Sequence, residues 1–308
     1  SIYSFESALD DLSNETKIVL IERLLTKVSA FFDGFCFGGH RGSPLNAPEN
    51  TLASFEQARK EGVDLVEFDI GFTKDFVPVL MHDDFLDRTT NMTGALNKYT
   101  LEELAKCNCA AKFRSLNAPD VVCDPELLFT LEELIEWAIK NNIKMLFDIK
   151  DKEPKLVKQI VLLFERYKLY NKAIVCSFFP SVVYRIKRGN HNILTGEFIS
   201  YEDLEFTVPR FSSKMVHSFA VLLDILWILS IKLWIPEFLG VNMVLTERRE
   251  ISNFYIKLMN ARGLKVCAWT VNERNEMAWL SRELKIPFLT DVPYIANHLL
   301  KNENSEKN

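Results

Sequence analysis

Several features are scarce or missing in this chain of 308 residues, and each absence excludes a class of protein. The six cysteines form no CxxC pair, and the single CxC of Cys107 and Cys109 does not support a zinc site. We therefore interpret the cysteines as buried or free thiols. The formal net charge is only −5, which gives no overall attraction to nucleic acid. An anionic ligand would have to be bound by local positive charge or by a metal ion.

Short apolar runs alternate with helical stretches from residue 35 onward. This alternation predicts a parallel sheet with helices packed outside it. The expected strands are 35–41, 64–72, 76–82, 144–150, 173–178, 193–198, 241–246, 264–271 and 286–290. The expected helices are 51–61, 130–141, 153–168, 181–189, 249–262 and 273–285.

The third of these nine strands does not belong to the parallel set. Only residues 73–75 separate it from the second strand, and parallel strands need a connection of about a dozen residues or more. We therefore expect residues 76–82 to return antiparallel to the second strand as a hairpin. Eight parallel strands remain, which predicts a TIM (β/α)8 barrel. The hairpin also brings His82 close to Glu67 and Asp69 on the outward strand.

The barrel domain is predicted to span residues 35–300, and four segments depart from its rhythm. Residues 1–34 are expected to form an N-terminal helical segment, and residues 301–308 a polar tail. Residues 83–129 hold no obvious barrel element and are interpreted as a small insertion. Residues 199–240 are interpreted as a second, apolar helical insertion near the active-site rim of the barrel.

Charged residues gather at the carboxyl ends of the predicted strands, which is where barrels of this type carry their active sites. Glu67 and Asp69 are two apart in a strand and share a face, and Asp148 and Lys150 do the same on the next barrel strand. Three converging carboxylates favour Mg²⁺ or Ca²⁺ over zinc. The alternative is a buried salt-bridge network that these side chains form with Arg41.

Two of the five histidines, His40 and His82, lie at strand ends beside these carboxylates. A single histidine on an apolar strand is more often a satisfied core residue. A pair in this setting is better interpreted as a general acid and a general base. Arg41 and Lys150 supply local positive charge that a phosphate group requires.

The residues at these strand ends resemble the motifs of the glycerophosphodiester phosphodiesterase family. The match extends through nearly the whole predicted barrel, and the combination is far more specific than any one motif. Its motifs are Gly39-His40-Arg41-Gly42, Ala47-Pro48-Glu49-Asn50-Thr51, Glu67-Phe68-Asp69, Val79-Leu80-Met81-His82-Asp83, Arg88-Thr89-Thr90 with Gly94, Asp148-Ile149-Lys150, Ser177-Phe178, Trp269-Thr270-Val271-Asn272 and Thr290-Asp291.

The resemblance implies a TIM barrel in which residues 83–129 form the small insertion of the family. It implies a divalent cation, Mg²⁺ with Ca²⁺ as the alternative, and a glycerophosphodiester substrate. Many members have Glu where this chain has Asp148, so the ion preference can differ. The implied roles are His40 and His82 as acid and base, Glu67, Asp69 and Asp148 as metal ligands, and Arg41, Lys150, Glu49 and Trp269 on the substrate side.

The implied reaction is metal-dependent hydrolysis of diesters such as glycerophosphoinositol to glycerol 3-phosphate and an alcohol. The nucleophile is either water or the glycerol 2-hydroxyl. A lysophospholipase D that acts on acylated lysophospholipids or N-acyl-glycerophosphoethanolamine is an alternative. A non-catalytic interaction scaffold at the membrane is another, although the intact pair of His40 and His82 argues against it.

Residues 215–235 form the longest apolar run and are about long enough to span a bilayer. Asp224 and Lys232 within the run would be costly in lipid, whereas Trp227 and Trp234 suit a membrane interface. We favour a helix or helical hairpin on the membrane surface, or one that lines a lipid-accepting groove. An extra packed helix pair is the alternative.

Within the family, this insertion resembles a membrane-associated animal branch. That resemblance implies a membrane-associated protein with its catalytic domain in the lumen or outside the cell. Two glycosylation sequons, at residues 14–16 and 91–93, permit such a location.

Overall fold

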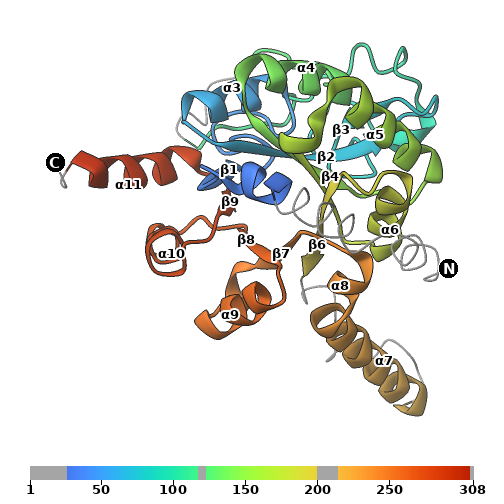
Figure 1. Ribbon diagram of the computed structural model, residues 1–308. Coiled ribbons are helices and arrows are strands. Elements are labelled where there is room, and N and C mark those ends of the chain that lie inside the picture. The colour runs from blue at the N-terminus through green and yellow to red at the C-terminus, as the bar shows by residue number, and fades with distance from the viewer. Residues whose placement is uncertain (1–25, 117–122, 200–213, 306–308) are drawn as a thin grey trace.

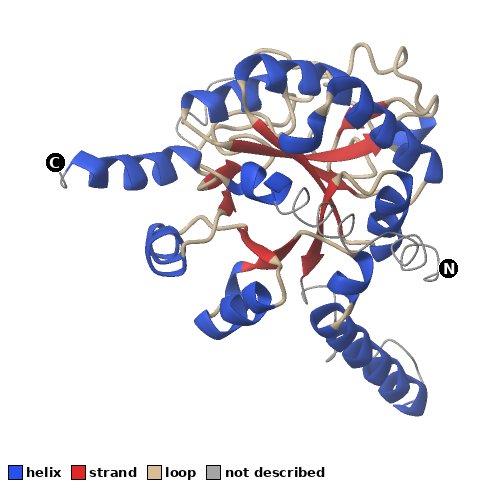
Figure 2. Ribbon diagram, in the orientation of Figure 1, coloured by secondary structure: helices blue, strands red, loops and turns tan. Residues whose placement is uncertain are grey.

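The computed structural model describes residues 26–116, 123–199 and 214–305, and its core is a closed barrel of eight parallel strands (Figures 1 and 2). The first strand pairs with both the second and the last, which closes the sheet. This confirms the predicted TIM barrel. The strands are β1 (Phe37–Gly39), β2 (Leu65–Phe72), β4 (Lys144–Ile149), β5 (Ala173–Ser177), β6 (Leu194–Ile199), β7 (Met243–Glu247), β8 (Lys265–Trp269) and β9 (Phe288–Thr290).

The remaining strand, β3 (Pro78–Leu80), lies antiparallel to β2. Ile70 pairs with Leu80, and the Met81 amide donates to the Asp69 carbonyl at 3.1 Å. The hairpin is therefore confirmed. It carries the chain from β2 back to His82 at the same end of the barrel.

Helices cover the outside of the barrel. The start of α4 (Leu131–Asn141) is capped as its sequence suggests, because Thr130 and Glu133 form a reciprocal capping box there. The helices are α3 (Leu52–Lys60), α4 (Leu131–Asn141), α5 (Pro154–Tyr167), α6 (Pro180–Gly189), α8 (Ile235–Leu239), α9 (Asn253–Ala261), α10 (Arg274–Trp279) and α11 (Pro293–Ser305), with short turns η1 (Leu96–Lys98), η2 (Leu169–Asn171), η3 (Arg248–Glu250) and η4 (Leu280–Leu284).

The apolar core has two layers, as expected when alternate residues of each strand face the helices and the barrel interior. Phe68 and Phe147 represent the outer layer, beneath the helices, and Leu65 and Leu146 the interior. Residues 26–32 are helical, and Phe31 from this helix joins the interior cluster. Residues 1–25 of the expected N-terminal helical segment lie outside the described residues.

The segment predicted as a small insertion has an apolar cluster of its own. Leu86, Leu96 and Leu104 pack there with Cys107, against Met81 next to the hairpin. An isolated antiparallel β-bridge between Phe85 and Ala95 brings two parts of this segment together. At the other end of the chain, α11 continues through Ser305, so part of the expected polar tail is helical.

Helix α7 (Lys214–Leu233) projects away from the barrel (Figure 1). Those side chains of α7 whose burial the structure describes are exposed or half-buried, whereas an extra packed helix pair would bury one face of the helix. Lys232 pairs with Glu250 at 3.1 Å, and Arg262 donates to the Lys232 carbonyl at 2.5 Å. These contacts tie the end of α7 to η3 and α9. Among the described residues, Met215–Leu233 is the one helical stretch whose length and apolarity suffice to cross a bilayer.

Candidate active site

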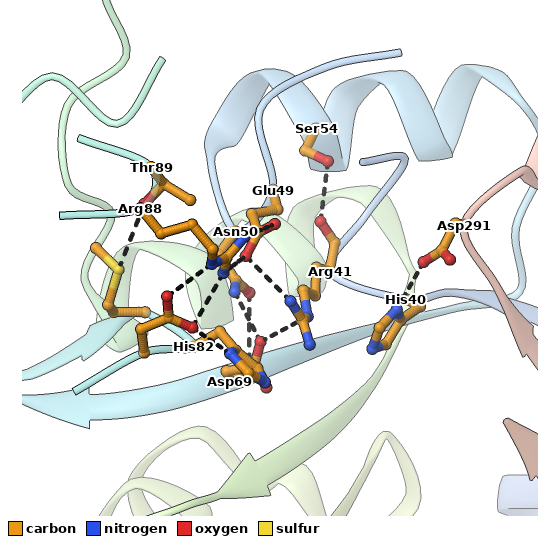
Figure 3. A network of polar contacts seen from close by, with 12 residues as sticks. His40, Arg41, Glu49, Asn50, Ser54, Asp69, His82, Arg88, Thr89 and Asp291 are labelled. Carbon is orange, nitrogen blue, oxygen red and sulfur yellow. Dashed lines mark hydrogen bonds and ion pairs between the residues drawn. The ribbon is translucent and has the colours of Figure 1, made fainter. Parts of the chain in front are cut away.

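A pocket opens at the carboxyl ends of the barrel strands, where the sequence places its charged residues. Figure 3 shows part of its lining, His40, Arg41, Asp69 and His82, with groups that they contact. One side is ionic and comes from β1, β2, β4 and the end of the hairpin. The other side is apolar and comes mainly from β5, β6 and β8. The lining residues are His40, Arg41, Glu67, Asp69, His82, Asp148, Lys150, Phe178, Phe198, Trp269 and Leu289.

The three predicted metal ligands converge in this pocket. Glu67 and Asp69 face the interior from β2, and Asp148 stands beside Asp69 in the parallel register of β4. One carboxylate oxygen from each residue lies within 4.8 Å of the other two, and all three side chains are buried. Such an arrangement is unfavourable unless positive charge compensates it.

Burial and mutual repulsion separate the acidities of these carboxyl groups. Burial, reinforced by the charge of Asp69, raises the pKa of Glu67 to about 8. Burial raises the pKa of Asp148 to about 6. Burial also opposes ionisation of Asp69, but Arg41 and Lys150 outweigh it and lower the pKa of Asp69 to about 2. Burial and mutual repulsion therefore disfavour the simultaneous ionisation of all three carboxyl groups.

The salt-bridge network, the alternative to a metal site, is also present. Lys150 Nζ lies 2.9 Å from Asp148 Oδ2 and 3.2 Å from Asp69 Oδ1, and Arg41 Nε lies 3.1 Å from Asp69 Oδ2. Arg41 is shared with Glu49 at 3.1 Å, so the two cations do not balance the acids around them. In addition, the buried Asp148 Oδ1 has no hydrogen-bond partner among the residues that the structure describes. The residues thus fit an oxygen-ligated divalent cation.

Each predicted acid–base histidine is held by a neighbouring carboxylate. His40 Nδ1 lies 2.7 Å from Asp291 Oδ1, and His82 Nδ1 lies 2.5 Å from Asp83 Oδ1. A carboxylate at Nδ1 orients the ring and leaves Nε2 for proton transfer. Burial opposes protonation of His40, but Glu67 and the hydrogen bond with Asp291 raise its pKa overall. Burial lowers the pKa of His82, so the two rings differ in acidity.

Glu49 and Trp269 differ in their relation to the pocket. Glu49 is not among the lining residues and instead accepts hydrogen bonds from Arg41 and Arg88. Trp269 lines the pocket, and its indole Nε1 donates to the Leu245 carbonyl at 3.1 Å. Trp269 therefore presents an apolar ring rather than its polar atom.

An aromatic cluster completes the apolar side, and sequence reasoning assigned no role to two of its members. Phe178 and Phe198 stack with ring centroids 4.4 Å apart, and Trp269 meets both edge to face. The residues that hold the histidines were also given no role. Asp291 follows β9, which barrel closure places next to β1, so strand order alone would have brought it to His40. Asn50, which donates to Asp69 Oδ2 at 2.8 Å, has no comparable signal in the strand pattern.

Comparison with known proteins agrees with this geometry. The family model described as "Glycerophosphoryl diester phosphodiesterase family" matches residues 40–295. Glycerophosphodiester phosphodiesterase 1 from Bos taurus is 38% identical over 82% of this chain and 76% of its own length. The Homo sapiens protein of the same name is 36% identical with the same coverage.

Solved structures share the fold at lower identity. A putative glycerophosphoryl diester phosphodiesterase from Silicibacter pomeroyi superimposes with a TM-score of 0.69 at 19% identity, over 89% of this chain and 98% of that one. A phosphodiesterase from Oleispira antarctica, solved with the product sn-glycerol-3-phosphate, gives 0.65 at 22% identity, over 86% and 96%. From the family match and the mammalian relatives, the chain belongs to the glycerophosphodiester phosphodiesterase family and is an enzyme of that class.

Proposed function

We propose that this enzyme releases glycerol 3-phosphate from glycerophosphodiesters in a reaction that depends on a divalent cation. The observation that carries the proposal is the cluster of three buried carboxylates, within 4.8 Å of one another, in the pocket that also contains His40 and His82. Such a cluster opposite two carboxylate-supported histidines suits the hydrolysis of a phosphate diester.

Glu67, Asp69 and Asp148 are the residues that would hold the cation. Their donor atoms are carboxylate oxygens alone, which favours Mg²⁺, with Ca²⁺ as the second candidate. A bound cation would neutralise charge on the phosphate oxygens and stabilise the charge that develops in the transition state.

The side chains around the cluster perform the remaining steps. Arg41 and Lys150 bind the nonbridging phosphate oxygens and hold the phosphorus between the two histidines. One histidine removes the proton from the nucleophile through Nε2, and the other donates a proton to the departing alkoxide. Because Asp291 and Asp83 occupy the Nδ1 atoms, both histidines present the same nitrogen to the substrate.

The apolar side of the pocket is compatible with two substrate classes. The rings of Phe178, Phe198 and Trp269 offer carbon surface and line the pocket opposite the charged groups. This surface accommodates the glycerol carbons of a glycerophosphodiester such as glycerophosphoinositol. It equally accommodates the start of an acyl chain, so lysophospholipids and N-acyl-glycerophosphoethanolamine are the alternative substrates.

Helix α7 supports a membrane-associated enzyme. An exposed apolar helix in water is unfavourable, and Trp227 and Trp234 on it and next to it suit the lipid–water interface. The catalytic domain then faces the lumen or the cell exterior, and the exposed Asn91 of the second sequon is available for glycosylation there. The helix leaves the barrel after β6, so lipid contact and pocket lie on connected parts of the chain.

The test is release of glycerol 3-phosphate from a panel of glycerophosphodiesters and lysophospholipids with Mg²⁺, Ca²⁺ or EDTA. We expect turnover that EDTA abolishes, and a loss of about 10²- to 10⁴-fold in His82→Ala. His191→Ala, at an exposed histidine outside the pocket, is the matched control and should retain activity. Turnover rates across the panel show whether the headgroup or the acyl chain determines the substrate preference. Absence of turnover with either metal would refute the proposal and favour the membrane scaffold.

A further inference from the structure

A single arginine from the segment predicted as an insertion binds two carboxylates beside the pocket. Arg88 donates to Glu49 from Nη1 at 2.9 Å and from Nη2 at 2.6 Å. It donates to Asp83 from Nε at 2.6 Å and from Nη2 at 3.1 Å. One planar guanidinium thus engages both oxygens of two acids, a geometry that lysine does not reproduce.

Each of these two acids contacts a residue that lines the pocket. Glu49 Oε1, which accepts from Arg88, also accepts from Arg41 Nη1 at 3.1 Å. Asp83 Oδ1, which accepts from Arg88, also contacts His82 Nδ1 at 2.5 Å. Two short chains of contacts therefore start at Arg88, as Figure 3 shows. One reaches the phosphate-binding arginine, and the other reaches an acid–base histidine.

The backbone that carries Arg88 is itself well held. Thr90 Oγ1 donates to the Leu86 carbonyl at 2.8 Å, and the Leu86 amide donates to the Gly94 carbonyl at 3.0 Å. Leu86 is fully buried in the apolar cluster of this segment. Arg88 is 47% exposed, so its ion pairs add little to the free energy of folding. Their effect is to fix the orientation of the Glu49 and Asp83 carboxylates.

We propose that Arg88 is a positioning residue that sets the orientation of His82 through Asp83 and of Arg41 through Glu49. The proposal rests on the proposed function, because both orientations matter only for phosphodiester hydrolysis. Without Arg88, Asp83 is free to rotate away from the His82 ring. Glu49 keeps its negative charge and then pairs with Arg41 alone of these two arginines. This stronger pairing draws the Arg41 side chain away from the phosphate. Misplacement of a reacting group by about 1 Å is enough to lower a rate by about 10²-fold.

The two contact chains make separable predictions for steady-state kinetics with Mg²⁺ and a glycerophosphodiester. Asp83→Asn alters the contacts that lead from Arg88 to His82 and is expected mainly to lower kcat. Glu49→Gln alters the contacts that lead from Arg88 to Arg41 and is expected mainly to raise KM. Arg88→Ala disturbs both, and we expect kcat/KM to fall about 10²-fold, with changes in both constants. Arg88→Lys keeps the positive charge but lacks the planar donor geometry of a guanidinium, so its kcat/KM should remain well below that of the wild type.

Two further measurements separate positioning from a structural role. Guanidinium at a concentration far below denaturation should restore part of the activity of Arg88→Ala, because it fits between the two acids. The double variants Arg88→Ala/Asp83→Asn and Arg88→Ala/Glu49→Gln should lose less than the product of the single losses. The control is Arg114→Ala, at an exposed arginine elsewhere in residues 83–129, which should keep wild-type kinetics.

The outcomes distinguish the two proposals. If the wild type turns over substrate while Arg88→Ala stays within twofold in both kcat and KM, the positioning role is wrong and the proposed function stands. The positioning role is also wrong if the Arg88→Ala loss is additive with both acid variants and guanidinium restores nothing. If the wild type turns over no diester, the proposed function fails, and the role of Arg88 fails with it.

Discussion

Glu197 is a buried carboxyl group whose titration should be measurable as stability. It lies on β6, where Leu194 and Phe198 face the barrel interior, so the alternation of the strand turns Glu197 toward the layer beneath the helices. Its side chain is fully buried, and within the part of the chain that the structure describes neither carboxylate oxygen has a hydrogen-bond partner. Burial alone raises its pKa from 4.5 to about 8.

The sign and size of the effect follow from this difference in pKa. Between pH 4.5 and pH 8 the folded protein keeps a proton that the unfolded chain has lost, so stability falls as the pH rises through this window. At about 1.4 kcal/mol per pH unit, the free energy of unfolding decreases by about 4 kcal/mol between about pH 5 and about pH 9. Glu197→Gln carries no ionisable group and lacks this decrease.

Thermal unfolding at several pH values, with saturating Mg²⁺, tests the prediction. The Tm of Glu197→Gln should be close to that of wild type near pH 5 and higher by about 8 °C near pH 9, at about 2 °C per kcal/mol for a chain of this size. Other groups with a raised pKa, such as Glu67, are present in both proteins, so their contributions cancel in the Tm difference. Glu102→Gln, at an exposed glutamate, is the control and should not change the pH dependence. A Tm difference that stays constant from acid to alkaline pH would refute the reasoning.

Three further predictions concern the site and the membrane. Asp148→Asn removes the charge of a proposed metal ligand, so added Mg²⁺ should no longer raise its Tm; an unchanged response to Mg²⁺ would contradict the proposed ligand role. His40→Ala should lower kcat by about 10²- to 10⁴-fold, and Asp291→Asn by less; equal activity in all three proteins would exclude the acid–base role. Leu226→Glu on α7 should reduce sedimentation with phospholipid vesicles while turnover of a water-soluble diester is kept, whereas Leu162→Glu, at an exposed leucine of α5, should bind vesicles like wild type.

The fold was predictable because covalent distance limits what a strand can pair with. The three residues 73–75 exclude a parallel crossover, and removing that one strand gives the count of eight that the structure confirms. The meeting of Glu67, Asp69 and Asp148 was predictable for a similar reason. Strand spacing fixes which face a side chain occupies, and parallel strands end at the same rim.

Contacts that depend on side-chain rotamers were not predictable in this way. His82 and Asp83 are consecutive, and strand alternation places such neighbours on opposite faces, yet the chain has left β3 by then and the two side chains meet. Arg88 reaches Glu49 across 39 positions because the loop after the hairpin folds back, and no periodicity records that return. Sequence patterns thus bring together the charged residues at the strand ends, and through strand order also Asp291 beside His40, but they do not reveal the contacts of Asp83 and Arg88.

The junction between β1 and β9 ties catalysis to the completeness of the chain. His40 directly follows the first strand, yet its ring is held by Asp291, at a sequence separation of 251, and its amide donates to the Thr290 carbonyl at 3.0 Å. The charged carboxylates and His82 all lie in the first half of the sequence, so a nascent or truncated chain already contains them. Only when the last strand closes the ring does His40 acquire its support. Until the final strand has been added, the chain therefore lacks the carboxylate that orients the His40 side chain, although the other groups of the pocket are already present.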